Sequence, residues 1–352
     1  MFFYIRRRSV IVLLFIVFSA ISLGLFSQEP VIGIHVHSFF DNPEFGVNGL
    51  RPSRTEAGVR LGGQVGFRWD TTSALCAGFS GVHEYGSKTS FVATEPMVYY
   101  SSHRKHLRYF IGAFPRRETI GNYPRIFFRD SIANYRTVLN GIFYELRSEA
   151  LFANAWLDWT GRQSIEERES FFVGWAAGWN YCRFHARLFG YLFHFAPSAN
   201  PDVHDPLHDN ALQLFSGGID LSGLLPIDVL DITLGHCIGL ERNRDIKRWH
   251  TPQGVLSELR LGHYGFRIVN SLYCGDPQQV FPENGSKLYW GDPVYRQRLY
   301  NRTDFSYTCT PLRHVKVEIT CSLHVGEQTV DYEQMLHLYV DLDNCLDFIR
   351  KH

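Results

Sequence analysis

Long segments of alternating apolar and polar residues run through most of this chain beyond residue 55, and they constrain its fold more than any other feature. In residues 59–69 the odd positions hold mainly valine, leucine, phenylalanine and tryptophan, whereas the even positions hold arginine, glutamine or glycine. Residues 168–181 and 314–325 show the same period of two. Because successive side chains of a β-strand point to opposite faces, each segment predicts a strand with one apolar and one polar face.

The predicted strands are unusually long. Strands of soluble proteins mostly have about 5–6 residues, whereas a tilted strand needs about 9–11 to cross a membrane. We therefore predict an all-β fold, an antiparallel transmembrane β-barrel of about 16 strands, or 14 if both terminal strands are absent. The predicted strands span residues 31–39, 56–70, 72–86, 89–102, 105–115, 137–148, 150–160, 167–181, 183–197, 209–222, 227–241, 254–263, 265–274, 303–312, 314–325 and 333–343.

The connections between these strands alternate in length, which is typical of outer-membrane barrels with short periplasmic turns and longer external loops. The short turns are predicted near residues 71, 103–104, 149, 182, 223–226, 264 and 313. The external loops are predicted at 40–55, 87–88, 116–136, 161–166, 198–208, 242–253, 275–302 and 326–332.

Three features fit the barrel less well. Pro96 lies within a predicted strand, where it removes a ladder hydrogen bond and indicates a bulge or a later strand start. The first strand, 31–39, stands apart from the others in sequence. The C-terminal residues 333–352 also fit a helical apolar stripe, so their conformation is left open.

Charged residues fall on the polar faces of the strands and are expected to point into the barrel, because an arginine or lysine in the middle of the lipid costs about 2–4 kcal/mol. Such residues could line an open pore and select solutes by charge. Alternatively, they could pair with one another and close the interior. The pore-lining candidates are Arg60, Arg68, Arg108, Glu145, Arg147, Asp158, Arg168, Arg183, Arg187, Lys316 and Glu318.

The amino terminus resembles a secretory signal peptide. Three arginines, Arg6 to Arg8, precede an apolar run from Val10 to Phe26, and a polar stretch follows. We predict a signal peptide at 1–27 and a barrel at 28–352, with an uncleaved anchor as the alternative. Either segment would export the chain, and together with the barrel it indicates the outer membrane of a Gram-negative bacterium.

Composition and motifs exclude several function classes. The chain has 35 basic and 35 acidic residues, so no overall positive charge favours nucleic acid as a partner. No linear motif of a hydrolase, a phosphate loop or a metal framework is present, so we expect no enzyme, no cofactor and no metal. A hydrolase dyad built from distant strands, for example around His83 or His263, stays a minor alternative. A metal site formed by His204, Asp205, His208 and Asp209 is disfavoured because Pro201 and Pro206 prevent a helix that would align them.

Three sequence segments carry a resemblance to known proteins: Gly112–Arg116 (GAFPR), Trp156–Gln163 (WLDWTGRQ) followed by Arg168–Phe171, and Leu288–Tyr295 (LYWGDPVY). They resemble a functionally uncharacterised, porin-like family of outer-membrane β-barrels from Bacteroidetes. The resemblance runs over most of the predicted mature chain and implies a barrel in the outer membrane. It implies no activity for any particular residue.

The function predicted from the sequence is a porin-like channel for small hydrophilic solutes, with outer-membrane lipid as its surroundings. The alternative is a closed barrel whose external loops bind a glycan or a protein. Tyr289, Trp290, Tyr295 and Tyr300 are the loop-binding candidates, because aromatic rings can stack on a sugar. The same rings could instead fold the loop into the barrel mouth.

Overall fold

The computed structural model describes residues 29–46, 53–202, 206–245, 248–281 and 289–343. The predicted signal peptide and residues 344–352 lie outside these ranges. The described chain is almost entirely strand, with two short 3-10 helices, η2 (Arg116–Glu118) and η3 (Pro293–Arg296), and one α-helix, α2 (Asp130–Tyr135). No helix in the described ranges is long and apolar enough to cross a membrane.

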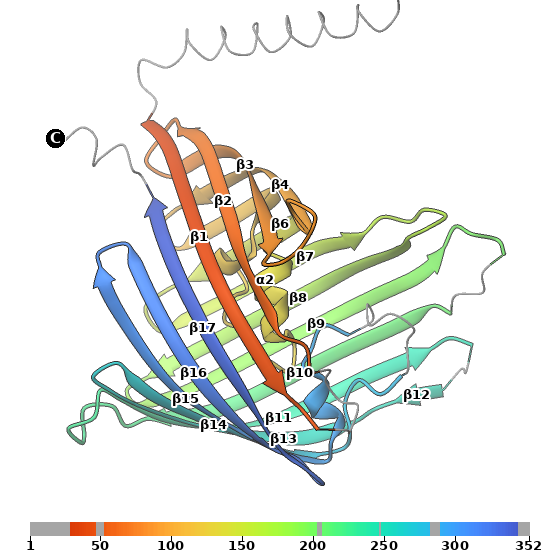
Figure 1. The fold of residues 1–352 in the computed structure, drawn as a ribbon, viewed down its shortest axis with the longest axis vertical. Helices are drawn as coiled ribbons and strands as arrows, with labels where there is room; N and C mark the ends of the chain where they lie inside the picture. The colour runs from red at the N-terminus through yellow and green to blue at the C-terminus, as the bar shows by residue number, and fades with distance from the viewer. Residues whose placement is uncertain (1–28, 47–52, 203–205, 246–247, 282–288, 344–352) are drawn as a thin grey trace, which may run out of the picture.

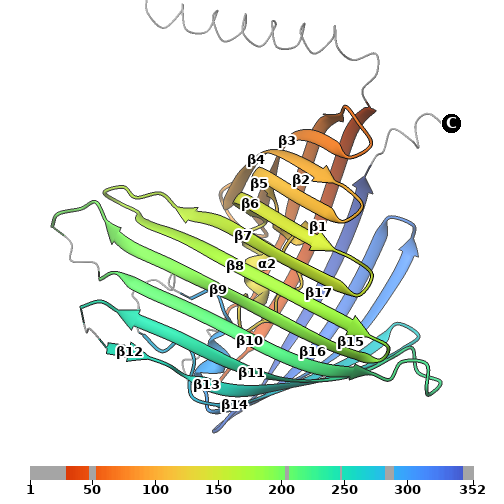
Figure 2. The same ribbon diagram turned by 180° about the vertical axis from the view of Figure 1, so that it is seen from behind.

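Sixteen strands pair antiparallel with their sequence neighbours, and the last strand pairs with the first, so that the sheet closes into a barrel (Figures 1 and 2). The short strand β12 (Arg248–His250) pairs only with the end of β11. The barrel strands are β1 (Glu29–Glu44), β2 (Glu56–Arg68), β3 (Ser73–Glu84), β4 (Ala93–His103), β5 (Leu107–Pro115), β6 (Val138–Arg147), β7 (Leu151–Gly161), β8 (Arg168–Tyr181), β9 (Phe184–Ser198), β10 (His208–Asp220), β11 (Val229–Asn243), β13 (Gln253–His263), β14 (Phe266–Gly275), β15 (Leu299–Leu312), β16 (Val315–Val325) and β17 (Val330–Asp343).

The prediction of a barrel with sixteen strands is confirmed. The first and last predicted strands, which had the weakest sequence support, are both long and pair with each other, for example at Val36 and Val340. The described part of the C-terminal segment is therefore strand and not helix. β15 begins at Leu299, so the predicted loop 275–302 is shorter than expected at its C-terminal end.

Pro96 lies inside β4 without a shift of register. It pairs with Phe79 of β3, but the ladder between β4 and β5 begins only at Val98. Because Pro96 precedes this ladder, its lack of an amide hydrogen removes no hydrogen bond between β4 and β5. The strand starts later than predicted, and no bulge is needed.

The outer face of the barrel is a belt of exposed apolar side chains. Val65, Leu234 and Phe215 are about 60% exposed, whereas their polar or small neighbours along each strand face the interior. A continuous apolar exterior on a closed sheet suits hydrocarbon, because no backbone edge is left unpaired there.

The two ends of the barrel differ. Connections of two to eight residues lie at one end, the turn end, together with the start of β1 and the end of β17. Most connections at the other end, the loop end, are longer, and they range from four residues at 326–329 to 23 at 276–298. Two of them, 116–137 and the described parts of the second, 276–281 and 289–298, fold into the barrel instead of extending away from it. We call these two segments the plug.

Candidate functional site

The two segments of the plug bind each other inside the barrel. The backbone amide of Arg129 donates to the carbonyl of Trp290 at 2.8 Å, and the amide of Asp292 donates to the carbonyl of Arg125 at 3.0 Å. Gln279 Nε2 donates to the carbonyl of Ile126 at 3.1 Å. These bonds join the two segments at three points, so the two segments form one unit.

Aromatic packing holds the plug against the barrel wall. Phe127 is fully buried, and its ring lies edge-on to Tyr191 of β9 with 5.6 Å between centroids. Trp290 contacts Phe172 of β8 in the same manner at 4.9 Å. The loop half of the interior is therefore a packed core and not an open passage.

The four predicted loop-binding residues belong to this core. Tyr289, Trp290, Tyr295 and Tyr300 are each at most 8% exposed. Tyr289 donates its hydroxyl to the buried carboxylate of Glu241 at 2.8 Å, and Tyr300 lies in β15. The rings are therefore not displayed on an external loop. They lie inside the barrel, as in the alternative in which the loop folds into the barrel mouth.

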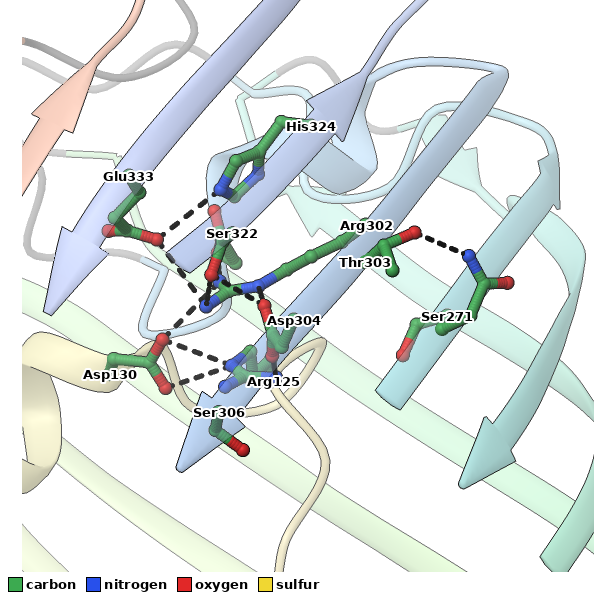
Figure 3. A network of polar contacts seen from close by, with 12 residues as sticks. Arg125, Asp130, Ser271, Arg302, Thr303, Asp304, Ser306, Ser322, His324 and Glu333 are labelled. Carbon is green, nitrogen blue, oxygen red and sulfur yellow. Dashed lines mark hydrogen bonds and ion pairs between the residues drawn. The ribbon is translucent and has the colours of Figure 1, made fainter. Parts of the chain in front are cut away.

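A buried charge network fixes the plug to strands β15 to β17 (Figure 3). Arg302 is 3% exposed and lies 2.6 Å from Asp304, 3.4 Å from Asp130 and 3.4 Å from Glu333. Arg125 of the plug pairs with Asp130 at 2.9 Å and with Asp304 at 3.0 Å. Since Asp130 and Arg125 come from the plug while the other charges come from the wall, the network joins the two.

Two further predicted pore residues are also used to hold the plug and the loops. Asp158 is fully buried and forms an ion pair with Arg116 at the start of the plug. Arg168 donates to the carbonyls of Ala196 and Pro206 at the loop end. Both point inward as expected, but neither lines an open space.

A large cavity of about 1780 Å³ occupies the turn half of the barrel and reaches along the plug to Asp130 and Arg302. Its wall includes residues of the turn end, such as Arg104 and Arg183, and it also borders Tyr123 and Arg125 of the plug. Seven predicted pore-lining residues lie on this wall: Arg60, Arg108, Glu145, Arg147, Arg183, Arg187 and Glu318.

The last two predicted residues lie near the turn end without lining the cavity. Arg68 lies 3.5 Å from Glu29, and Lys316 lies 2.7 Å from Glu318. Whether any of the eleven charges controls the passage of a solute stays a prediction.

Within the described residues, the histidines considered from the sequence lie far from one another or pair separately. His208 is buried, while His204 and Asp205 lie outside the described residues. Within the described ranges, no group of three or more ligand-type side chains could hold a metal ion. His83 contacts the carbonyl of Ser90, and His263 lies 3.5 Å from Asp228 at the turn end.

One histidine–carboxylate pair lies on the outer face of the barrel near the loop end. His194 of β9 is the register partner of Asp209 of β10, and each is flanked along its strand by buried, inward-facing residues. The pair belongs to a row that crosses six strands, in which each member faces the next: Trp159, Phe171, His194, Asp209, Arg242 and Trp249. Polar residues in the middle of this row break the apolar belt.

The row fixes the imidazole of His194 from both sides. Its ring stacks on Phe171 with 5.0 Å between centroids, and Phe171 stacks on Trp159 at the same distance. On the other side, Nδ1 of His194 lies 3.5 Å from Oδ1 of Asp209. Arg244 holds the same carboxylate through two hydrogen bonds, of 2.8 and 3.1 Å.

No hydrogen bond occupies Nε2 of His194 within the described part of the chain, so this nitrogen is available to bind a proton. The arrangement combines a base, His194, with a carboxylate that orients it and a nearby cation. Such a combination suits general base catalysis. The sequence analysis missed this pair. The available signal was a histidine and an aspartate on the apolar parity of their strands.

The comparisons with known proteins address both the family and the fold. A family described as lipid A 3'-O-deacylase-type matches residues 27–348. No curated protein matches the sequence significantly. Because the family is named for an enzymatic activity, our expectation of a protein without enzymatic activity is wrong.

Solved outer-membrane proteins share the barrel architecture. A loop-deletion mutant of OmpT from Vibrio cholerae has a TM-score of 0.56 at 7% identity, over 90% of this chain and 99% of that chain. OccK3 (OpdO) from Pseudomonas aeruginosa has a TM-score of 0.55 at 11% identity, over 90% and 96% of the two chains. At these identities the likeness shows the fold alone. The association with Bacteroidetes stays a prediction.

Proposed function

Since this chain belongs to the lipid A 3'-O-deacylase-type family, we propose that it is an outer-membrane ester hydrolase that removes an acyl chain from a lipid A-type lipid. We further propose that His194 and Asp209 carry out the reaction on the outer face of the barrel. The loop end then faces the cell exterior, as in barrels with long external loops.

The position of the His194–Asp209 pair carries this proposal. The pair faces outward, close to the ends of β9 and β10 that lead into the loops. Trp159 and Trp249, at the two ends of the row, are 43% and 46% exposed, and tryptophan favours the boundary between headgroups and acyl chains. The ester bonds of an acylated saccharide lie at that boundary. A base inside the barrel would not reach them.

The proposed chemistry is hydrolysis with an activated water. Nε2 of His194 accepts a proton from a water molecule, whose oxygen attacks the ester carbonyl and forms the new carbon–oxygen bond. Asp209 orients the imidazole and stabilises its charged form. As the bond between the carbonyl carbon and the saccharide oxygen breaks, His194 returns the proton to that oxygen. The products are a free fatty acid and a saccharide hydroxyl.

Two arginines provide positive charge beside this pair. Arg244 binds Asp209 directly, and Arg242 lies over the ring of Trp249, 5.1 Å from its centroid. A cation near the reacting ester stabilises the negative charge that develops on the carbonyl oxygen.

The experiment is a fatty-acid release assay on the purified, full-length protein with lipid A in mixed micelles, read by mass spectrometry. His194→Asn should lower the rate by about 10²–10⁴-fold, the usual contribution of a general base. Asp209→Asn should also lower the rate. The matched controls are His83→Asn and His263→Asn, which change the two other histidines named from the sequence.

Folding of each variant is checked by its mobility on a detergent gel with and without boiling. If His194→Asn keeps the parent rate, the reaction site lies elsewhere. If the folded parent protein releases no fatty acid from any acylated saccharide lipid, the proposed activity is wrong.

A second candidate function is the passage of small hydrophilic solutes, which the size of the cavity and its charged wall favour. The plug packs the loop half of the interior, so passage would require the plug to move. The test is conductance in a planar bilayer, and the absence of conducting steps in folded protein would remove this function.

A further inference from the structure

Six basic residues gather on one wall of the cavity near the turn end. We call them the turn-side patch: Arg104, Lys105, Arg108, Arg147, Arg183 and Arg187. They come from the turn between β4 and β5, strands β5 and β6, the turn between β8 and β9, and the start of β9. The whole chain has a formal net charge of zero, so this concentration of positive charge is local.

The patch contains far more positive than negative charge. Within the described residues, Glu145 is the carboxylate that forms ion pairs with it, at 3.4 Å from Arg108 and 3.0 Å from Arg147. Arg183 donates to the backbone carbonyls of Asp220 and Ser222. Glu145 therefore pairs with two of the six cations, and Asp220 and Asp231 act on Arg183 and Arg187 only from beyond ion-pair distance.

Arg187 is held in place without a carboxylate. It donates to the carbonyls of Trp179 and Ala186 at 2.9 Å and to the side-chain oxygen of Asn180 at 2.6 Å. These neutral acceptors orient the guanidinium, and within the described residues no carboxylate forms an ion pair with it.

A single aromatic ring brings Arg147 and Arg187 together. In the register of β6 to β9, the inward-facing row is Arg147, Phe152, Gly178 and Arg187. The two guanidinium carbons lie 5.3 and 5.9 Å from the centroid of the Phe152 ring. Gly178 makes this possible, because a Cβ at that position would lie 2.1 Å from a carbon of the ring.

Such an arrangement has an electrostatic cost. Two like charges repel each other, and the attraction of each cation to the aromatic ring offsets this repulsion only in part. An anion that contacts both guanidinium groups would remove the repulsion. Arginine suits this task, because its planar fork matches the oxygen geometry of phosphate.

We propose that the turn-side patch binds a small soluble polyanion with phosphate-type groups, which enters the cavity from the turn end. Arg147 and Arg187 contact it from the two sides of Phe152, and Arg183 and Arg104 supply further positive charge. This site is separate from the proposed hydrolase site, because the patch faces the cavity whereas His194 faces outward. The binding of the anion needs no catalytic activity.

The test is isothermal titration of the full-length protein in a neutral detergent with inorganic pyrophosphate. The double substitution Arg183→Gln and Arg187→Gln should weaken binding by about tenfold or more, since two charge-assisted contacts are removed. Arg187→Lys, which keeps the charge but not the fork, should weaken it less than Arg187→Gln. Raising the salt concentration should weaken binding by the parent protein, because screening acts on exposed charges.

The matched control is Arg260→Gln. Arg260 lines the same cavity from β13, but it is paired with Glu258 at 2.5 Å. Its loss should change binding less than about twofold, because its charge is already compensated. Equal effects of the control and the double substitution would overturn the proposal, as would an absence of pyrophosphate binding by folded parent protein. Neither outcome depends on fatty-acid release, so the two proposals fail separately.

Discussion

The loop half and the turn half of the barrel interior both contain many arginines, but they compensate their charge in different ways. In the loop half, Arg302 and Arg125 share the carboxylates of Asp130 and Asp304, and Arg302 is almost fully buried. In the turn half, Arg187 is only half-buried where it borders the cavity, and it donates hydrogen bonds only to neutral acceptors. Burial of a charge requires a partner, whereas a charge beside water can stay available for a ligand. The difference separates arginines that maintain the fold from arginines that are available for binding.

Arg302→Met should produce the largest effect. It leaves Asp130, Asp304 and Glu333 near one another without their common cation, and breaking a buried pair in this way costs about 3–5 kcal/mol. The free energy of unfolding, measured by denaturant titration of protein folded into vesicles, should fall by this amount. Arg267→Met is the control, since Arg267 lines the cavity and forms no ion pair in the described part of the chain. A similar loss in both variants would contradict the distinction between the two halves.

Gly178→Val should have the next largest effect, and it acts in the turn half without changing a charge. Its side chain would collide with the ring of Phe152, and overpacking of this kind costs about 1–3 kcal/mol. Displacing the ring should also separate Arg147 from Arg187 and weaken pyrophosphate binding. At Gly217 of β10, a Cβ would meet its nearest atom only at 3.9 Å, so Gly217→Ala is the matched control and should bind normally. Normal binding by Gly178→Val would show that the ring does not organise the patch.

Tyr289→Phe tests the loop half on a smaller scale. It removes the hydroxyl that donates to Glu241, whose carboxylate would keep the backbone amides of Gln279 and Val280 as donors. Losing one of several donors to a buried carboxylate should lower the free energy of unfolding by about 1–3 kcal/mol. The same denaturant titration measures it. An unchanged stability would mean that the plug contributes little to the fold.

The sequence predicted the wall of the barrel well because the alternation of apolar and polar residues in each strand shows which face meets lipid. In β16, for example, Val317, Ile319 and Leu323 alternate with Glu318, Thr320 and Ser322, and this alternation defines the strand and its orientation. β1 and β17 were harder to identify, because their pairing depends on closure of the whole sheet.

The plug could not be predicted in the same way. Segment 116–137 has no periodic pattern, and its position depends on contacts with residues far away in sequence, such as Trp290 and Gln279. The aromatic residues Tyr123, Phe127 and Phe128 were the available signal, because an external loop has no need of so many buried rings. The same limit applies to His194 and Asp209, which become neighbours only in the register of β9 and β10.

Arg187→Gln should have the smallest effect on stability, and this makes it the sharpest test of the comparison. Because Arg187 has no carboxylate partner and borders the cavity, removing its charge leaves no buried anion unpaired and relieves its repulsion with Arg147. The free energy of unfolding should therefore change by less than about 0.5 kcal/mol, as for a surface substitution, or rise slightly. Adding pyrophosphate should stabilise this variant less than the parent protein, because a ligand that binds the folded state more weakly stabilises it less. A loss of several kcal/mol without any ligand would instead place Arg187 with Arg302, as a residue that maintains the fold.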